Sequence, residues 1–127
     1  MRIDKDLVAA SATPLVLGIL AEDESSYGYA ILKRIRDLSD GKMAWTDGML
    51  YPLLHRLERQ GLIAASWQKS PEGRRRKHYA LTKEGREALA EKQDQWAVVS
   101  EALGRIWQAS ALPAPTSPPA MPRMVIA

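Results

Sequence analysis

The 127-residue sequence predicts a mainly α-helical fold with a small β-hairpin: a winged helix-turn-helix followed by a long C-terminal helix. Three observations predict this class. Two stretches with helical apolar spacing flank a short Gly-containing turn. Two strand-like runs then flank a turn with Pro and Gly, and a seven-residue apolar repeat marks the last helix. We expect a winged-helix domain at 1–82, a long helix at 83–109 and a proline-rich flexible tail at 110–127.

The first helix is expected over residues 3–22. Pro14 can serve as a first-turn residue after Thr13, or it can kink a longer helix. The run from Leu15 to Leu20 is apolar on nearly all sides, which predicts deep burial, some of it against a second subunit. Residues 23–26 are expected to form a polar turn.

The second helix is expected over residues 27–38. Its core-facing stripe has helical spacing and consists of Tyr27, Ile31, Leu32, Ile35 and Leu38. Gly28, next to the helix start, is better explained by close packing than by ligand contact. Residues 39–42 then form the turn of the helix-turn-helix.

The third helix has two distinct faces. Its apolar arc holds four leucines, whereas hydroxyl, imidazole and guanidinium groups occupy the opposite side. Thr46 is the expected N-cap, with its hydroxyl accepting a backbone N–H, and Gly61 is the expected C-terminal stop. Pro52 removes a hydrogen bond to Gly48, so we expect a bend or a loosened first turn without a break in the helix. A helix fixed by one face and polar on the other suits DNA reading, although an ordinary amphipathic core helix has the same pattern.

A basic hairpin is expected directly after this helix. Residues 62–68 and 74–81 have strand-like composition, and SPEG at 70–73 supplies the turn. Its cations are Lys69, Arg74, Arg75, Arg76 and Lys77. A solvated turn or a localisation-like basic run would also contain RRRK. Because this run follows a candidate recognition helix, we interpret it as a phosphate-contacting wing.

The positive charge is confined to this region. The net charge is +3, yet residues 41–79 hold 8 basic and 3 acidic side chains, a net charge of +5. Residues 1–40 carry a net charge of −2 and residues 80–127 carry none. Confinement of positive charge to one segment predicts a polyanionic partner, here double-stranded DNA.

The last helix is expected from Lys83 to about Gln108, roughly 39 Å at 1.5 Å per residue, with Thr82 as its cap. Its apolar repeat consists of Leu89, Trp96, Val99, Leu103 and Ile106, with Trp107 adjacent. So long a helix has too little of its own chain to pack on. We therefore expect it to form a homodimer.

Other classes of function receive little support from the sequence. The chain has no Cys, and its longest apolar run, 14–21, is far shorter than the roughly 20 residues of a membrane span. We expect a soluble cytoplasmic protein that does not contact the membrane. His55 and His78 are the only histidines, and no catalytic set or metal-ligand cluster is evident, so we expect no enzyme, metal or cofactor. Both histidines are expected at the solvent edge, where they could contact phosphate when protonated. The alternative to DNA binding is a winged helix used only for protein–protein docking.

The ordered motifs resemble the PadR family of bacterial transcriptional regulators. They are YGYAILKRI at 27–35, GMLYPLLHRLERQGLI at 48–63, the strand with Trp67, GRRRKHYALTKEG at 73–85 and one long terminal helix. The resemblance covers residues 5–108 and is similar to the short subfamily. It implies a homodimeric repressor on a pseudo-palindromic operator, with the third helix in the major groove and the hairpin along the phosphates.

These features give a specific set of candidate site residues. The recognition-helix candidates are Thr46, Tyr51, His55, Arg56 and Arg59, with Tyr51 also placed to contact a phosphate. The wing cations would neutralise flanking phosphates. The resemblance further implies an aromatic effector at the dimer interface, near Trp96, Val99, Leu103, Ile106 and Trp107. For Trp96 itself we favour a plain dimer-packing role, because large aromatic residues commonly anchor interfaces.

Overall fold

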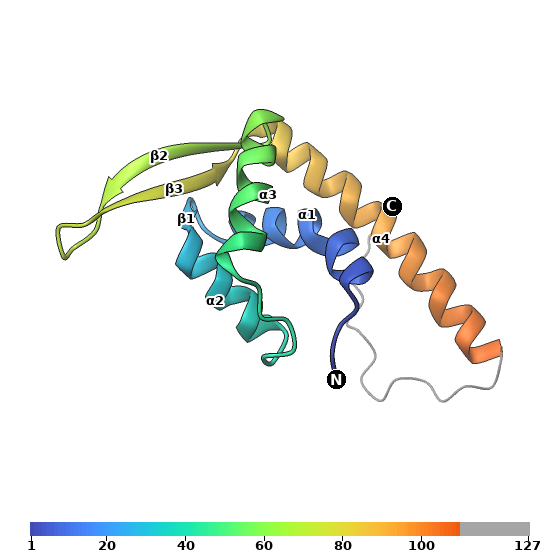
Figure 1. The fold of residues 1–127 in the computed structure, drawn as a ribbon. Helices are drawn as coiled ribbons and strands as arrows, with labels where there is room; N and C mark the ends of the chain where they lie inside the picture. Colours follow the sequence, from blue (N-terminus) through green and yellow to red (C-terminus); the bar gives the residue numbers. More distant parts are fainter. Residues whose placement is uncertain (110–127) are drawn as a thin grey trace. The chain divides into compact units, whose positions relative to one another are not determined.

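The computed structural model describes residues 1–109, in which four helices and three strands follow one another along the chain (Figure 1). The elements are α1 (Lys5–Glu22), β1 (Ser26–Tyr27), α2 (Gly28–Leu38), α3 (Asp47–Arg59), β2 (Ile63–Lys69), β3 (Arg75–Leu81) and α4 (Lys83–Ala109). The predicted mainly α-helical winged helix-turn-helix with a long last helix is confirmed. The predicted proline-rich tail at 110–127 lies outside the described residues. The chain divides into two compact units, one of residues 1–89 and one beginning at Ala90.

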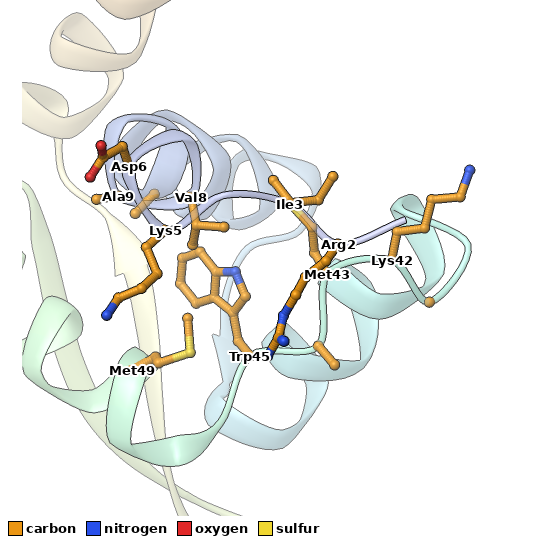
Figure 2. Close-up of a pocket in the computed structure, with 13 residues that line it drawn as sticks. Arg2, Ile3, Lys5, Asp6, Val8, Ala9, Lys42, Met43, Trp45 and Met49 are labelled. Atoms are coloured by element: carbon orange, nitrogen blue, oxygen red, sulfur yellow. The ribbon is translucent and has the colours of Figure 1, made fainter.

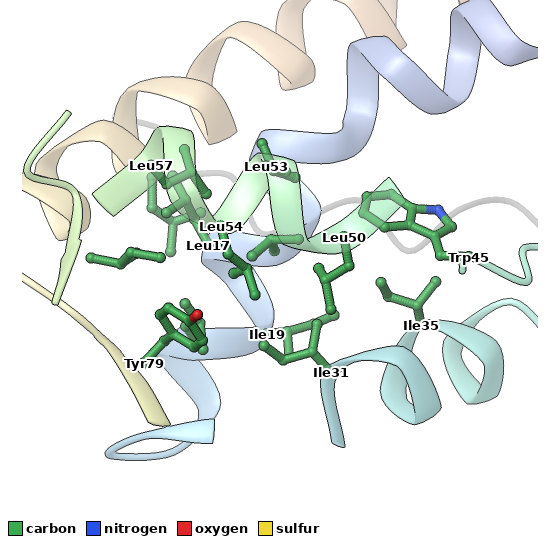
Figure 3. Packing of buried hydrophobic residues seen from close by; sticks show 14 residues of the cluster. Leu17, Ile19, Ile31, Ile35, Trp45, Leu50, Leu53, Leu54, Leu57 and Tyr79 are labelled. Carbon is green, nitrogen blue, oxygen red and sulfur yellow. The ribbon is translucent and has the colours of Figure 1, made fainter. Parts of the chain in front are cut away.

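A single apolar core holds the first unit together. Leu50, Leu53, Leu54 and Leu57 of α3 are all buried, as the apolar arc of this helix predicts. They meet Leu17 of α1, the isoleucines of α2 and the ring of Tyr79 on β3 (Figure 3). Burial of such side chains stabilises a fold by roughly 1.5–3 kcal/mol each. This core therefore fixes which face of α3 remains exposed.

The two ends of α3 are formed differently from one another. At its C-terminus, the Gly61 N–H donates to the Glu58 carbonyl (3.0 Å) and the Leu62 N–H donates to the Leu57 carbonyl (3.0 Å). Gly61 has φ +78°, which completes a Schellman motif and confirms the predicted stop. At the N-terminus Thr46 is the N-cap residue, but its hydroxyl forms no capping bond. That part of the prediction was wrong, because the hydroxyl is left on the exposed side of the helix start.

Both helical prolines lie inside unbroken helices. Pro52 is within α3, and Pro14 is within α1 and not in its first turn. The α1 helix is buried at Val16, Leu17, Ile19 and Leu20, as predicted, whereas Leu7 nearer its start is 52% exposed. Leu38 was predicted to face the core but is 49% exposed, because it is the last residue of α2, beyond the reach of the α3 leucines.

The sheet has one strand more than the predicted hairpin. Antiparallel β2 and β3 pair from Ile63 opposite Leu81 to Lys69 opposite Arg75, which confirms the hairpin. Ser26 and Tyr27 form β1, which pairs antiparallel with β3 and gives the order β1-β3-β2. Residues 23–26 were predicted as a turn and Tyr27 as the first helical residue. Two residues are too few to show strand periodicity, so β1 was missed.

The start of α4 is capped as predicted. The Thr82 hydroxyl accepts the Gly85 N–H (3.0 Å) and donates to the Gly61 carbonyl (2.6 Å). This one side chain therefore joins the start of α4 to the end of α3. None of the helices in residues 1–109 combines the length and the apolar character needed to cross a bilayer.

Candidate nucleic-acid interface

The polar face of α3 is open to solvent. All five candidate residues of the recognition helix are exposed: Thr46, Tyr51, His55, Arg56 and Arg59. Since the leucines occupy the opposite face, these side chains are held on a rigid support. Backbone carbonyls at the C-terminus of α3 carry partial negative charge, which Arg56 and Arg59 in the last turn offset.

The wing cations fall into two groups. Lys69, Arg74 and Arg75 lie at the hairpin tip and are exposed, whereas Arg76 and Lys77 are half-buried. Figure 1 shows the hairpin extending beyond the helices of the first unit, with residues 70–74 at its far end. The tip is therefore the part of the wing whose positive charge is open to solvent.

Three of the cations contact aromatic rings. The guanidinium carbon of Arg75 lies 5.2 Å from the Trp67 ring centroid, and that of Arg76 lies 4.5 Å from the Tyr27 centroid. The Lys77 ammonium lies 5.5 Å from the Tyr79 centroid. Cations within about 6 Å of a ring face are attracted by its quadrupole, so these contacts stiffen long side chains before any ligand arrives.

The wing and α3 share one hollow of about 360 Å³. It is lined by Tyr51 and His55 of α3, by Trp67, Arg76, Lys77 and Tyr79 of the hairpin, and by Tyr27 and Gly28. An ion pair between Lys77 and Glu58 (3.8 Å) also joins β3 to α3. The two predicted DNA-contacting elements are therefore brought together on one side of the first unit.

Close packing fixes the start of α2 against α3. A Cβ atom on Gly28 would overlap the Tyr51 hydroxyl and ring, so only glycine leaves room for this side chain. This confirms that Gly28 serves packing. Tyr51 is 36% exposed, which means that one part of its ring packs on α2 while another part reaches solvent.

The prediction that His78 lies at the solvent edge was wrong. Its Nδ1 lies 3.1 Å from the Ser25 hydroxyl, and its ring centroid lies 5.2 Å from that of Tyr27. Because β1 pairs with β3 at this position, His78 is half-buried in the sheet. His55, by contrast, is exposed on α3.

The core beneath the interface holds one ionisable ring. Tyr79 is 1% exposed, and burial raises the pKa of its phenol, while the neighbouring Lys77 ammonium acts in the opposite direction. Desolvation disfavours a phenolate, so this ring remains neutral at physiological pH. The base of the wing is thus supported by an uncharged ring.

Two aromatic rings of this interface are not predicted by the sequence. The sequence predicts Tyr27 as a core residue of α2 and Trp67 only as part of a strand, whereas both rings line the hollow. The alternation of β2 gives a signal for Trp67, because it shares a strand face with Ala65, the neighbour of buried Tyr79, and with Lys69 at the tip. Tyr27 carries no such signal, because its place depends on β1.

The predicted dimer edge of α4 is largely exposed. Val99 is 48% exposed, Leu103 39%, Ile106 58% and Trp107 44%, whereas Trp96 is half-buried. Leu89, at the start of the repeat, belongs to the core of the first unit. Across residues 1–109, no three His, Cys, Asp or Glu side chains are grouped as a metal site would require.

Comparison with known proteins identifies the fold and the family. The transcriptional regulator PadR-like family matches residues 16–91, more than half of the chain. A PadR-like regulator structure from Bacillus cereus has a TM-score of 0.74 at 27% identity, and the match covers 82% of this chain and 98% of that one. A PadR family regulator from Eggerthella lenta is 37% identical with a TM-score of 0.65, covering 80% of this chain and 85% of that one.

A relative from Escherichia coli is also named as a transcriptional regulator. Transcriptional regulator YqjI of Escherichia coli is 34% identical over 89 residues, which cover 70% of this chain and 41% of that protein. PadR regulators bind DNA, are generally dimeric and are not enzymes. Because it has the winged helix, the basic hairpin and this family match, the chain belongs to the PadR-like family of transcriptional regulators.

Proposed function

We propose that this chain is a homodimeric repressor that binds a pseudo-palindromic operator through α3 and the β2–β3 wing. The observation that carries the proposal is the shared hollow between the polar face of α3 and the basic hairpin. In winged-helix proteins of this geometry, a helix in the major groove reads base edges while nearby cations neutralise phosphates. Such a regulator would work in the cytoplasm, where the chromosome lies.

Each element has its own role in this proposal. His55 and Arg59 face the major groove of one half-site, Thr46 and Arg56 lie at its margins, and Tyr51 contacts a phosphate. The unused Thr46 hydroxyl supports this assignment, since no capping bond occupies it. Lys69, Arg74 and Arg75 neutralise flanking phosphates, and Arg76 and Lys77 support them from the base of the wing.

Functionally, we divide the chain at Thr82, with residues 1–82 binding DNA and residues 83–109 forming the dimer. The exposed apolar edge of α4 supports this division, because burying Val99, Leu103 and Ile106 against a second copy removes their apolar surface from water. An aromatic effector that repacks this interface near Trp96 and Trp107 would change the spacing of the two α3 helices and release DNA.

Footprinting of the purified protein on genomic fragments, starting with its own upstream region, tests the proposal. We expect two protected half-sites about one helical turn, roughly 34–36 Å, apart. Arg59→Gln should change the preferred sequence, whereas Lys33→Gln on the outer face of α2 should leave it unchanged. Binding that is uniform across all fragments would exclude sequence-specific regulation through α3.

The proposed binding of an aromatic effector at the α4 interface has its own test. Titration with planar aromatic compounds should quench tryptophan fluorescence in the wild type, and Trp96→Phe should remove that part of the signal. This control is needed because the chain has 4 tryptophans. Quenching that is unchanged in Trp96→Phe would place the effector away from Trp96.

A further inference from the structure

Two residues on the polar face of α3 have no role in the proposed DNA binding. Gly48 and Pro52 are both exposed and lie inside this helix. Counted from Gly48, the helical spacing i+4, i+7 and i+11 reaches Pro52 and then the two groove-facing residues of the proposal, His55 and Arg59. The buried leucines occupy the opposite face. The two residues therefore lie in the row that faces the base edges of the major groove.

The backbone carbonyl of Gly48 lacks the donor that an α-helix normally gives it. The hydrogen bonds of α3 begin regularly, since the Leu50 N–H donates to the Thr46 carbonyl (3.1 Å). The donor to the Gly48 carbonyl would be the N–H of residue 52, but this residue is proline and has none. The proline ring also pushes against this carbonyl, and carbonyls on the solvent side of a helix tilt outward toward water. The Gly48 oxygen is therefore left without its helical donor on the exposed side of an unbroken helix.

The surface at Gly48 is open to another molecule. Apart from the helix's own backbone, a Cβ built on Gly48 would meet only the Thr46 hydroxyl oxygen, at 3.7 Å. That hydroxyl forms no capping bond with the helix. Because glycine has no side chain, a polar group of another molecule can approach the backbone closely at this point.

The start of α3 is held in place from its other side. Trp45, which lies just before the helix, is 7% exposed and belongs to the apolar core. Figure 2 shows its ring directly below Val8 of α1, with Met49 of α3 beside the ring. These contacts hold the first turn although one of its usual hydrogen bonds is missing. The Gly48 carbonyl therefore has a defined position before DNA arrives.

Only some base edges can donate a hydrogen bond to such an oxygen. In the major groove the donors are the N6 amino group of adenine and the N4 amino group of cytosine, whereas guanine and thymine present acceptors. Residues near the N-terminus of a recognition helix contact base edges, and Gly48 is the second residue of α3. A carbonyl at this position would therefore favour adenine or cytosine over guanine or thymine.

We propose that the Gly48 carbonyl, left without its helical donor by Pro52, accepts a hydrogen bond from the amino group of one adenine or cytosine in each half-site. Gly48 and Pro52 are then specificity-determining residues that act through the backbone, beside the side chains of His55 and Arg59. Pro52 keeps the acceptor unoccupied by the helix, and the missing side chain of Gly48 lets the base reach it. This inference rests on the proposed function in DNA binding.

Selection of binding sites from a random-sequence DNA library by the wild type and by Pro52→Ala tests the proposal. Alanine supplies the N–H that the Gly48 carbonyl lacks, so the helix itself would occupy this acceptor. We expect Pro52→Ala to lose the preference for adenine or cytosine at one position of each half-site and to keep the rest of the motif. Pro14→Ala, the matched removal of a proline inside α1, should select the wild-type motif. A wild-type motif in Pro52→Ala, or the same change in Pro14→Ala, would overturn the proposal.

Base analogues in the selected site separate the amino group from other contacts. Purine in place of the adenine, or 2-pyrimidinone in place of the cytosine, removes the amino group and should raise the wild-type Kd about threefold to tenfold. The Kd of Pro52→Ala should change less than about twofold, which also controls for the weaker base pair. Where the base is adenine, uracil in place of its thymine partner removes only the methyl group and should leave wild-type binding unchanged. Sensitivity to uracil but not to purine would assign the contact to the Pro52 ring and overturn the proposal.

Gly48→Ala tests the close approach while Pro52 stays in place. Its methyl group would stand in the open space beside the carbonyl, so affinity for the selected site should fall several-fold. Gly18→Ala in α1, where a Cβ also meets no other group, should leave affinity unchanged. Equal affinity of the Gly48→Ala and wild-type proteins would overturn the proposal. A wild type that selects no motif would overturn the proposed function as well, whereas a motif shared with Pro52→Ala would overturn this inference alone.

Discussion

Single residues set the geometry of the interface. Gly28 gives Tyr51 the space to lie across the start of α2, and His78 connects β3 to β1 through Ser25. Arg34 and Glu22 join α2 to α1 with two hydrogen bonds of 2.9 and 2.6 Å. The sequence predicted that Gly28 serves packing, but it did not identify its partner, because residues 28 and 51 meet only after α2 and α3 have packed.

Gly28→Ala tests the packing at this point. Alanine normally stabilises a helix by about 1 kcal/mol relative to glycine, yet here we expect a loss of about 1–3 kcal/mol, because the Cβ would overlap Tyr51. Gly18→Ala in α1 is the matched control, since a Cβ there meets no atom within 4 Å. Urea unfolding measures both, and Tyr51→Ala should relieve most of the loss in a double-mutant cycle. A Gly28→Ala protein as stable as Gly18→Ala would contradict this packing.

Glu22→Gln tests the contact between α1 and α2. Hydrogen bonds from Arg34 lower the pKa of the Glu22 carboxyl, opposed by a smaller desolvation effect. A lowered folded-state pKa gives stability that is present above the ordinary pKa and is lost as pH falls through the folded value. We therefore expect Glu22→Gln to lower the Tm slightly at pH 7, with the difference shrinking as pH falls below the ordinary carboxyl pKa of 4.5 and vanishing below the lowered folded-state pKa. Glu24→Gln, at an exposed neighbour, should show no such pH-dependent difference in Tm. A similar difference in Glu24→Gln would mean that the Tm change comes from general surface charge and not from the contact with Arg34.

At the scale of elements, periodicity predicted every helix and the hairpin. The four leucines of α3 and the alternation in β3 were sufficient, because both depend on burial of one face. What could not be predicted came from tertiary contacts. β1 exists only because β3 pairs with it, and Leu38 loses its core position at the end of α2. The cations of the site were predicted, whereas the aromatic rings Tyr27 and Trp67 were not.

Thr82→Ala tests the junction of α3, the hairpin and α4. Alanine removes the acceptor for the Gly85 N–H and the donor to the Gly61 carbonyl, so we expect a loss of about 1–2 kcal/mol in urea unfolding. Thr82→Ser keeps the hydroxyl and should lose much less. Equal stability of the two variants would mean that this hydroxyl does not stabilise the junction.

At the scale of the whole molecule, the proposed DNA binding requires two copies of the chain. One α3 helix reads only one half-site, and the exposed α4 edge has the apolar residues that a second copy would bury. The unit of residues 1–89 has its own core, so loss of the dimer need not unfold it.

Leu103→Glu should therefore give a folded monomer. A carboxylate at the centre of the proposed interface is costly to bury, so sedimentation equilibrium should show half the wild-type mass. Affinity for a two-half-site operator should fall at least about tenfold. Gln108→Glu, on the opposite side of α4, adds the same charge and should remain dimeric. Wild-type protein that is already monomeric at micromolar concentration would contradict the dimer.

Phosphate binding by the hairpin is tested most directly by the salt dependence of operator binding when the wing tip loses charge. We expect R74Q/R75Q to weaken binding to all sequences and to lower the slope of log Kd against log salt concentration by about 1–2, at roughly 0.9 per phosphate contact. K83Q/R86Q removes the same charge from the start of α4 and should leave the slope unchanged. An unchanged slope in R74Q/R75Q, or a change in sequence preference alone, would contradict the assignment of the hairpin to DNA phosphates.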